Sequence, residues 1–377
     1  MASEKCIRVL ALLARSHNVM VSGPPGTGKS KLLAEVALAF EDAFGLVSSA
    51  GKPHMNPKNG IPIPPSEGAD YDIPAPGKKD RKVFRTVFHQ NSKYRDFVSG
   101  IMPTVNKTYG SSDFTIIKGT LYRASEYAKL DNGSALLLID EINRGPAVQV
   151  FGGTIVSIES DKRLAPNGGR LDGTQFFEML DPDSGEVIEY ALPHDLYILA
   201  AMNQADASID PMDVAFLRRW EPLRLEPEEQ VLRGYYGLGP KSSDALPDVP
   251  TSAFNALEAS VRAWVAVNEQ IALGRGQEFQ IGHGVLMSDA KPHSLALPDT
   301  LEALCVGWAK VRAHVEEVFF GDIRGVAATL NALGSSSSNP FKLTETTFAD
   351  VLRFRLEGPT NFTASNIYSA LKAFSGE

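Results

Sequence analysis

The chain has 377 residues, of which 43% are hydrophobic and 22% charged, so it is long enough for two domains with sizeable cores. Its formal net charge of −8 excludes a general attraction to nucleic acid or to an anionic membrane. No stretch reaches the roughly 20 consecutive apolar residues of a membrane span, and Cys6 and Cys305 lack metal-ligand spacing. We therefore expect a cytoplasmic protein with free thiols and no membrane contact.

The N-terminal segment MASEKCIRVLALLARS places Cys6, Leu10 and Leu13 on one helical face. Because it begins with an acidic residue and carries arginines inside its apolar run, it indicates an amphipathic helix rather than a signal peptide. A short apolar strand over 18–21 and a helix over 31–40 are expected to follow, on either side of a loop rich in glycine and proline.

This loop, SGPPGTGKS at 22–30, has the spacing of a phosphate-binding loop. Its glycines allow backbone N–H groups to turn toward phosphate oxygens, Lys29 can reach the terminal phosphates, and the Ser30 hydroxyl can bind Mg²⁺. The helix that follows would direct its N-terminus at the same anion. We therefore predict a nucleotide site that includes Gly23, Pro24, Pro25, Gly26, Thr27, Gly28, Lys29 and Ser30.

Residues 1–227 have the pattern of one α/β domain. A Gly/Pro-rich segment over about 45–80 predicts a loop-like insertion. A strand-like run lies at 83–88, and continuous apolar runs predict buried strands at 135–139 and 196–201. Strands that alternate with helices predict a mainly parallel sheet with helices on both faces.

Between the second and third of these strands, we expect one helix from Pro146 to about Glu159. A second insertion over about 160–195 contains the run Asp181–Gly185, DPDSG, which indicates a turn between two hairpin strands.

Beyond residue 228 the strand signal fades and helical periodicity replaces it. Apolar residues recur at helical spacing over 254–271 and again over 301–318, which predicts a smaller α-helical domain over 228–334. The run SSSSNP at 335–340 is typical of a connection, so residues 335–377 are expected to be a linker and a short C-terminal extension.

Polar residues follow two of the predicted strands. Asp140 can hold Mg²⁺ through water, and Glu141 can orient and activate the attacking water. Asn203 ends the next strand, where its amide could bond that water or the γ-phosphate; a capping or turn role is the alternative. With the phosphate loop, these residues predict phosphoryl transfer to water.

Two arginines, Arg218 and Arg219, end a predicted short helix. In a ring of subunits, such an arginine can reach the nucleotide of a neighbour and stabilise charge in the transition state. Favourable placement of a cation at a helix C-terminus is the alternative, and the sequence does not separate the two arginines.

The order of these motifs resembles the AAA+ superfamily and, more narrowly, the NTPase motor subunit of McrBC-type modified-cytosine restriction systems, within the dynein-related and MoxR-like clade. The matching segments are FHQNSKYRDF at 88–97, DEINRG at 140–145, VFGG at 150–153, IESDKR at 158–163, LYILAAMNQAD at 196–206 and FQIGHG at 279–284. The resemblance implies an AAA+ P-loop core with a smaller α-helical lid, assembled as a hexameric ring with nucleotide bound between protomers.

The resemblance also implies nucleotide contacts from Asp206 and His283, although a structural hydrogen-bonding role is equally open for His283. Gln204 stands where the family usually has Thr, and Gly284 where its lid motif usually has Ser. GTP is the family expectation as substrate, and ATP is the alternative because a phosphate loop does not read the base.

The chain begins shortly before the phosphate loop, whereas restriction motors of this family usually carry an N-terminal domain that reads modified DNA. We expect DNA contact only through a partner or the ring pore, because the basic run KKDRK at 78–82 indicates a solvated loop edge.

Three functional hypotheses follow. The first is a ring-forming motor of a McrBC-like defence complex with a McrC-like or nuclease subunit. The second is a MoxR-like AAA+ ATPase that remodels a client protein. The third is a scaffold that assembles on nucleotide and hydrolyses it poorly.

Overall fold

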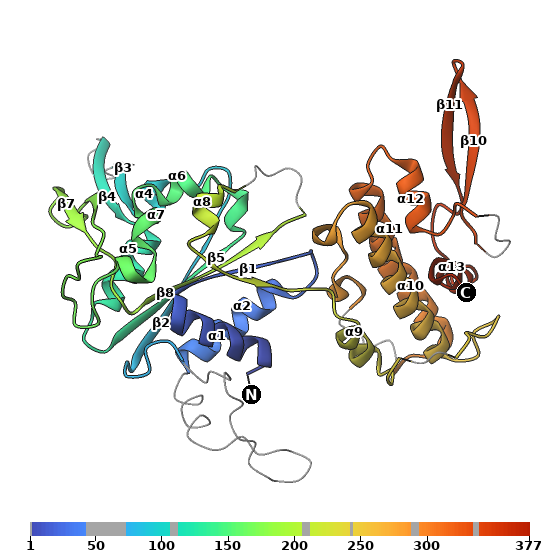
Figure 1. Cartoon of the computed structure of the whole chain (residues 1–377), viewed down its shortest axis with the longest axis horizontal. Coiled ribbons are helices and arrows are strands. Elements are labelled where there is room, and N and C mark those ends of the chain that lie inside the picture. The colour runs from blue at the N-terminus through green and yellow to red at the C-terminus, as the bar shows by residue number, and fades with distance from the viewer. Residues whose placement is uncertain are drawn as a thin grey trace, which may run out of the picture. The chain divides into compact units, whose positions relative to one another are not determined.

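The computed structural model describes residues 2–42, 73–105, 112–205, 212–241, 244–287, 294–334 and 339–377. The chain divides into two compact units and is coloured from blue to red along its length in Figure 1. The first unit comprises Met1–Ser22 and Lys29–Arg224, and the second comprises Gly23–Gly28 and Leu225–Glu377. Most of the insertion expected over about 45–80 lies outside the described residues.

The first unit is built on a five-stranded sheet with the order β2-β5-β8-β1-β9. The strands are β1 (Asn18–Gly23), β2 (Asp80–Val87), β5 (Gly133–Asp140), β8 (Leu196–Asn203) and β9 (Glu221–Arg224). The β1–β9, β2–β5 and β5–β8 pairs are parallel. β1 is buried at every position, and β5 and β8 at nearly every position, which is why they appear in the sequence as continuous apolar runs. The predicted parallel α/β sheet is confirmed.

Helices cover this sheet on both sides. In Figure 1, α1 (Glu4–Ser16) and α2 (Lys29–Glu41) lie together on one side, and several short helices lie on the other. The predicted N-terminal amphipathic helix is confirmed, because α1 buries Cys6, Leu10 and Leu13. Its first turn is capped by the Ser3 hydroxyl, which accepts a hydrogen bond from the Cys6 N–H at 3.2 Å.

The prediction of one continuous helix from Pro146 to Glu159 is wrong. The segment forms two short helices, α6 (Ala147–Phe151) and α7 (Thr154–Ser157), followed by a 3₁₀ turn, η2 (Ser160–Lys162). The break falls at Gly152, whose φ of 52° lies outside the helical region. A residue with a side chain would adopt this backbone conformation less readily than glycine. An added Cβ there would also lie 2.7 Å from the Tyr94 ring.

Among its described residues, the first unit also contains two hairpins and three more α-helices. β6 (Phe177–Leu180) and β7 (Val187–Tyr190) pair antiparallel on either side of the predicted turn, which confirms that hairpin. The hairpin of β3 (Ser99–Val105) and β4 (Ser112–Lys118) was not predicted, because Gly100 and Pro103 weaken the strand signal. These α-helices are α4 (Tyr94–Phe97), α5 (Thr120–Ala128) and α8 (Val214–Leu217).

The second unit is mainly helical. Its helices are α9 (Glu229–Tyr236), α10 (Ala253–Gly274), α11 (Leu297–Val318), α12 (Ile323–Thr329) and α13 (Ile367–Ser375), with 3₁₀ turns η3 (Gln277–Phe279) and η4 (His283–Leu286). The periodic stripes over 254–271 and 301–318 lie in α10 and α11, and they bury Trp264 and Trp308 in one core. Of the helices in the described ranges, none combines the length and the apolar character needed to cross a membrane.

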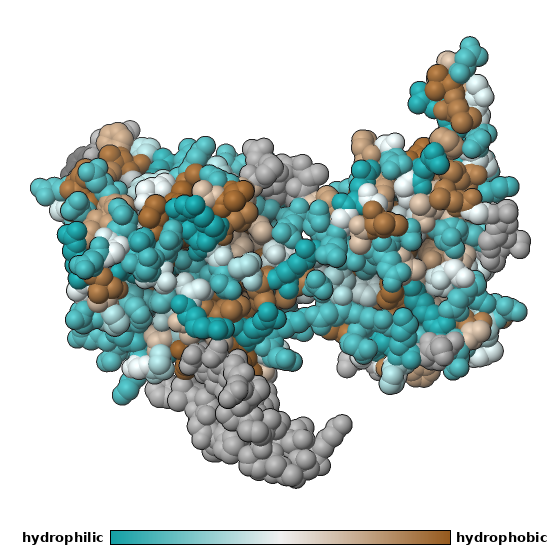
Figure 2. All heavy atoms as spheres, in the orientation of Figure 1, coloured by the Kyte–Doolittle hydropathy of each residue, from teal (hydrophilic) through white to brown (hydrophobic). Residues whose placement is uncertain are grey.

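Residues 339–377 belong to this helical core instead of forming a separate extension. Helix α13 packs against α10, and its apolar residues Ile367, Leu371 and Phe374 recur at helical spacing and are buried. β10 (Lys342–Phe348) and β11 (Val351–Glu357) form an antiparallel hairpin between α12 and α13 in the chain. Figure 2 shows apolar side chains on the surface of this hairpin, where Phe348 and Leu352 are exposed.

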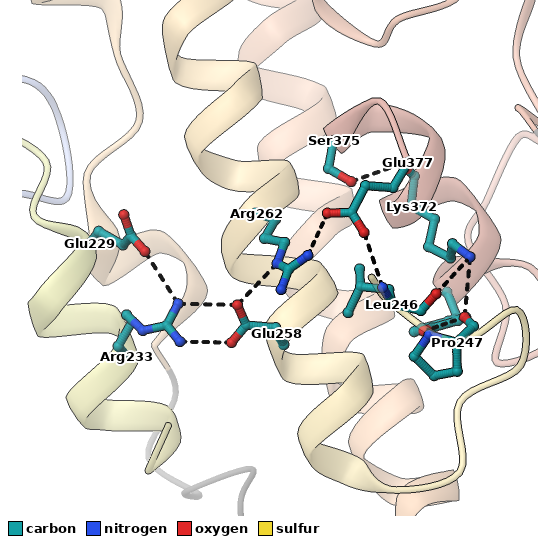
Figure 3. Close-up of polar contacts among 10 residues, drawn as sticks. Glu229, Arg233, Leu246, Pro247, Glu258, Arg262, Lys372, Ser375 and Glu377 are labelled. Atoms are coloured by element: carbon teal, nitrogen blue, oxygen red, sulfur yellow. Dashed lines mark hydrogen bonds and ion pairs between the residues drawn. The ribbon is translucent and has the colours of Figure 1, made fainter. Parts of the chain in front are cut away.

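An alternating chain of charges ties α9, α10 and the end of α13 together (Figure 3). The Arg233 guanidinium donates to Glu229 at 3.2 Å and to Glu258 at 2.8 Å. Arg262 donates to the other Glu258 oxygen at 3.1 Å and to Glu377 at 2.5 Å. Only 3% of the Arg233 side chain is exposed, so these carboxylates, rather than water, compensate its positive charge.

We predict that Glu258→Ala destabilises the second unit by about 3 kcal/mol, because it leaves a buried guanidinium without its shorter ion pair. The loss can be measured as a shift of the urea unfolding midpoint, followed by the fluorescence of the buried Trp264 and Trp308.

The matched control is Glu316→Ala, which removes the ion pair between Arg312 and Glu316 on α11. The Glu316 side chain is 49% exposed, so the cost should be below about 1 kcal/mol. Equal midpoints for the two variants would contradict the importance assigned to burial.

Candidate functional site

Three candidate residues lie at the carboxyl ends of two neighbouring strands. Asp140 is the last residue of β5, Glu141 follows it, and Asn203 is the last residue of β8. β5 and β8 pair in parallel, with Ile139 opposite Ala200. Parallel pairing therefore brings the ends of both strands to one edge of the sheet, which is where open α/β sheets bind ligands.

The Glu141 carboxylate is held from two directions. The Asn203 Nδ2 donates to both carboxylate oxygens, at 2.8 and 3.0 Å. The Arg144 Nε donates to the same carboxylate at 3.2 Å. Glu141 also adopts a left-handed backbone conformation, with φ 52° and ψ 43°. This conformation costs a residue with a side chain about 1 kcal/mol, and such strain is concentrated at functional sites.

Two further residues support this site, although no individual role was expected for them: Arg144 and its neighbour Asn143, both in the 3₁₀ turn η1 (Ile142–Arg144). The Asn143 Nδ2 donates to the backbone carbonyl of Asn203 at 2.7 Å, and the Asn143 residue is only 9% exposed. Asn143 thus fixes the end of β8, and Arg144 holds the Glu141 carboxylate. Their position in the sequence, just after the acidic pair Asp140-Glu141, was the one local feature that could have indicated these supporting roles.

Lys29, the first residue of α2, lies in the electrostatic field of these carboxylates. Burial lowers the pKa of the Lys29 ammonium to about 8, while the negative charges of Glu141 and Asp140 act in the opposite direction. The side chain is therefore a partly desolvated cation whose charge a bound polyanion would favour.

The donors present suit Mg²⁺. Asp140 Oδ1 accepts a hydrogen bond from the Glu141 N–H at 3.0 Å, which leaves Oδ2 of this half-buried carboxylate for a metal-bound water. Ser30 is exposed and supplies a hydroxyl oxygen in the first turn of α2. A carboxylate and a hydroxyl, with water completing the shell, form the hard oxygen set that Mg²⁺ prefers.

The predicted phosphate loop has the backbone conformation that its glycines allow. Gly26 and Gly28 have φ of 79° and 89°, in the region that residues with side chains rarely adopt. Within the loop, the Thr27 hydroxyl donates to the Pro24 carbonyl at 2.8 Å. The loop therefore has the tight turn geometry expected of an anion-binding backbone.

The structure separates the two adjacent arginines. Arg219 forms an ion pair with Glu159 at 2.9 Å, its side chain is 9% exposed, and it donates to the Ala215 carbonyl. Arg218 is exposed and forms no ion pair or hydrogen bond through its side chain with the described residues.

A buried polar pair supports the backbone beside these arginines. The fully buried Arg163 donates to Asn18 Oδ1 at 2.7 Å and to the Ile158 carbonyl at 2.8 Å. The Asn18 amide donates in turn to the carbonyls of Ile158, at 2.6 Å, and of Arg219, at 3.4 Å. This pair joins the start of β1 to the segments that carry Glu159 and Arg219.

The two remaining candidates were assigned from the resemblance. Asp206 lies outside the described residues. His283 is buried, with 7% exposure, and its Nδ1 accepts a hydrogen bond from the Glu228 N–H at 3.2 Å. A nucleotide contact by either residue stays a prediction.

The chain is similar to one protein-family model and to two components of restriction enzymes. Residues 78–220 match the family model described as AAA domain (dynein-related subfamily), a stretch that contains Asp140, Glu141, Asn203 and both arginines. Over 317 residues, 83% of this chain, it is 24% identical to the type IV methyl-directed restriction enzyme EcoKMcrB subunit of Escherichia coli K12. Over 221 residues, 56% of this chain, it is 28% identical to the type II restriction enzyme BsuMI component YdiS of Bacillus subtilis 168.

The aligned regions span 56% and 58% of those two proteins, so the chain corresponds to somewhat more than half of each. The family match confirms the predicted AAA+ core, and both relatives are components of restriction enzymes.

We predict that affinity for a magnesium–nucleoside triphosphate is constant well below pH 8 and falls as the pH rises through 8. Binding a polyanion favours the Lys29 ammonium and raises its pKa above the value of about 8 in the free protein. Raising the pH past 8 therefore deprotonates the free protein first, and affinity should fall by up to about tenfold per pH unit.

Titration with a non-hydrolysable analogue between pH 7.5 and 9.5 measures this effect. The matched control is Lys29→Arg, because a guanidinium remains charged throughout the range. Any affinity that Lys29→Arg retains should not change with pH, and a flat wild-type profile would contradict the role given to Lys29.

Proposed function

Because residues 78–220 are an AAA domain of the dynein-related subfamily in a McrB-like chain, we propose that the protein is the NTPase motor of a McrBC-like restriction or anti-phage defence complex. It hydrolyses GTP or ATP and works as a hexameric ring. The observation that carries this proposal is the Glu141 carboxylate, held by Asn203 and Arg144 at the sheet edge and close enough to influence Lys29.

Binding uses the phosphate loop and the residue that follows it. Backbone N–H groups of Gly23–Gly28 and the Lys29 ammonium hold the phosphates, and the N-terminus of α2 favours the same negative charge. Ser30, and Asp140 through water, would hold Mg²⁺. The metal ion, when bound, neutralises charge on the phosphate oxygens.

Hydrolysis uses Glu141 and Asn203. Glu141 accepts a proton from water as the water oxygen bonds to the γ-phosphorus and the bond from that phosphorus to the bridging β–γ oxygen breaks. Asn203 orients the water or the γ-phosphate. Glu141 Oε1 accepts from Asn203, whereas Oε2 accepts from both Asn203 and Arg144. Because a carboxylate oxygen has two lone pairs, Oε1 can also accept from the attacking water.

Catalysis is completed in the ring by an arginine from the neighbouring protomer. We assign this role to Arg218, because its exposed guanidinium has no ion pair among the described residues, whereas Arg219 is held by Glu159. Asp206 and His283 are proposed nucleotide contacts.

The partner is a McrC-like or nuclease-bearing subunit. Both relatives are named as a subunit or a component of a restriction enzyme, and a net charge of −8 provides no general attraction to DNA. We therefore propose a cytoplasmic complex in which DNA is reached through the partner or the ring pore.

Turnover measured with ATP and GTP side by side, with and without proteins encoded beside this one, tests the function. We expect Lys29→Ala to abolish nucleotide binding, because it removes the cation that meets the phosphates. Glu141→Gln should bind nucleotide normally and lose hydrolysis, since an amide cannot accept the proton.

Full turnover by Glu141→Gln would show that another group is the base. Strong stimulation by a nuclease-bearing neighbour supports restriction. Co-purification with a metalloenzyme client would instead indicate a MoxR-like remodelling ATPase, and binding without turnover would indicate a scaffold.

We predict that Arg218→Ala lowers turnover by about 10³-fold, in the range measured for arginine fingers, and leaves stability unchanged. Arg219→Ala should reduce stability instead, because it breaks the shielded contact with Glu159. Turnover and thermal unfolding of both variants provide the comparison.

A mixture tests whether Arg218 acts across an interface. Arg218→Ala protomers have an intact Glu141, and Glu141→Gln protomers have an intact Arg218, so mixed rings should regain activity. No recovery on mixing would place Arg218 outside the neighbour's site.

A further inference from the structure

A short segment of the second unit, Phe279–Gly284, contacts the phosphate loop directly, and we call it the strap. The Gly282 N–H donates to the Pro25 carbonyl at 2.9 Å, and the Gly284 N–H donates to the Gly26 carbonyl at 2.9 Å. Loop and strap both belong to the second unit, so these are contacts within one compact body.

The contact is so close that it requires glycine. A Cβ added at Gly282 would lie 2.1 Å from the Gly26 carbonyl carbon and 2.4 Å from the Thr27 nitrogen. A Cβ at Gly284 would lie 2.8 Å from the Gly26 oxygen. The glycine that stands where the resembling family usually has Ser therefore lies against the loop.

The other side of the strap is fixed to α10. The buried Asn268 amide makes a reciprocal pair of hydrogen bonds with Ile281, accepting from its N–H at 2.6 Å and donating to its carbonyl at 2.9 Å. The indole N–H of Trp264 donates to the same carbonyl at 3.1 Å. Because Asn268 is 5% exposed, water does not readily replace these bonds.

Further bonds hold both ends of the strap. The His314 Nε2 on α11 donates to the Phe279 carbonyl at 2.8 Å. His283 accepts from the Glu228 N–H just before α9. The strap is thus tied to α10, to α11 and to the residue just before α9, and it is also bonded to the phosphate loop.

The two loop carbonyls that accept from the strap determine where two loop N–H groups point. In a planar trans peptide the C=O and the following N–H point in opposite directions. A Pro25 carbonyl turned toward the strap directs the Gly26 N–H away from it, and the Gly26 carbonyl does the same for the Thr27 N–H. N–H groups of this kind are the ones that hold phosphate oxygens in such loops.

We propose that Asn268, Gly282 and Gly284 are positioning residues that hold the phosphate loop in its anion-binding form. The proposal rests on the proposed function for the identity of its ligand, a nucleoside triphosphate. Since the strap is fixed to α10 and α11, a partner that shifts these helices would change nucleotide affinity, and nucleotide would change partner affinity equally.

The test compares Asn268→Ala, Asn268→Asp and Gly284→Ala with a matched control, Gly334→Ala. Gly334 is a glycine of the same unit, and a Cβ added to it would meet no atom of the described residues within 4 Å. Asn268→Ala loses both hydrogen bonds to Ile281. Asn268→Asp keeps an oxygen that can accept from the Ile281 N–H but loses the donor to the Ile281 carbonyl. Two quantities are measured: hydrogen exchange of the Gly282 and Gly284 amides without nucleotide, and the Kd for fluorescent ATP and GTP analogues with Mg²⁺.

We expect Asn268→Ala and Gly284→Ala to increase amide exchange at the strap and to weaken nucleotide binding by tenfold or more. Asn268→Asp should be intermediate, and Gly334→Ala should resemble wild type. Turnover at saturating nucleotide should stay within about twofold of the wild-type value in all four variants, because none alters Glu141 or Asn203. A general loss of structure would instead lower this turnover.

If Asn268→Ala and Gly284→Ala both exchanged their strap amides faster but bound nucleotide with wild-type affinity, the positioning role would be overturned. The proposed function would remain intact. Unchanged exchange in Asn268→Ala would also overturn it, since the strap would then not depend on α10. A wild-type protein that binds neither analogue would refute the proposed function itself, and the positioning role with it.

Discussion

The candidate site depends on one contact between neighbouring strands, the amide of Asn203 against the carboxylate of Glu141. The contact exists because β5 and β8 run in parallel and end at the same edge of the sheet. Asn143 fixes the end of β8, and Arg144 holds the carboxylate from the other side. The left-handed backbone at Glu141 is sustained by this set of bonds, and it directs an acidic group to where a proposed hydrolysis needs its base.

A second support acts on the backbone that would hold phosphate. There a buried amide, Asn268, organises a glycine strap whose N–H groups take up the carbonyls of Pro25 and Gly26. Both supports follow the same principle, because a side chain or backbone group that must meet a ligand is oriented by hydrogen bonds to groups that do not meet it. The helical unit therefore has a physical means of influencing nucleotide affinity without contributing a charged group of its own.

Local patterns predicted much of the fold. Continuous apolar runs located β1, β5 and β8, and amphipathic spacing located α1, α10 and α11, because burial imposes these periodicities directly. The helix over 146–159 was predicted as one piece, since the period continues through Gly152 and only the positive φ there breaks it. The end of the chain was expected to stand apart, yet Leu371 and Phe374 lie in the core of the second unit, which their own short segment does not reveal.

For the proposed site, local sequence patterns predicted which residues supply the chemistry: the glycines and Lys29 of the loop, the acidic pair Asp140-Glu141, and the amide of Asn203. Spacing along the chain carries this information because the phosphate loop and the strand ends are local motifs. Only the tertiary structure distinguishes the surroundings of Arg218 from those of Arg219, since the ion-pair partner of Arg219 is Glu159, far away in sequence. It alone showed that Asn268 orients the strap against the loop, because a hydrogen bond between distant segments depends on how the chain folds, and no local pattern records it.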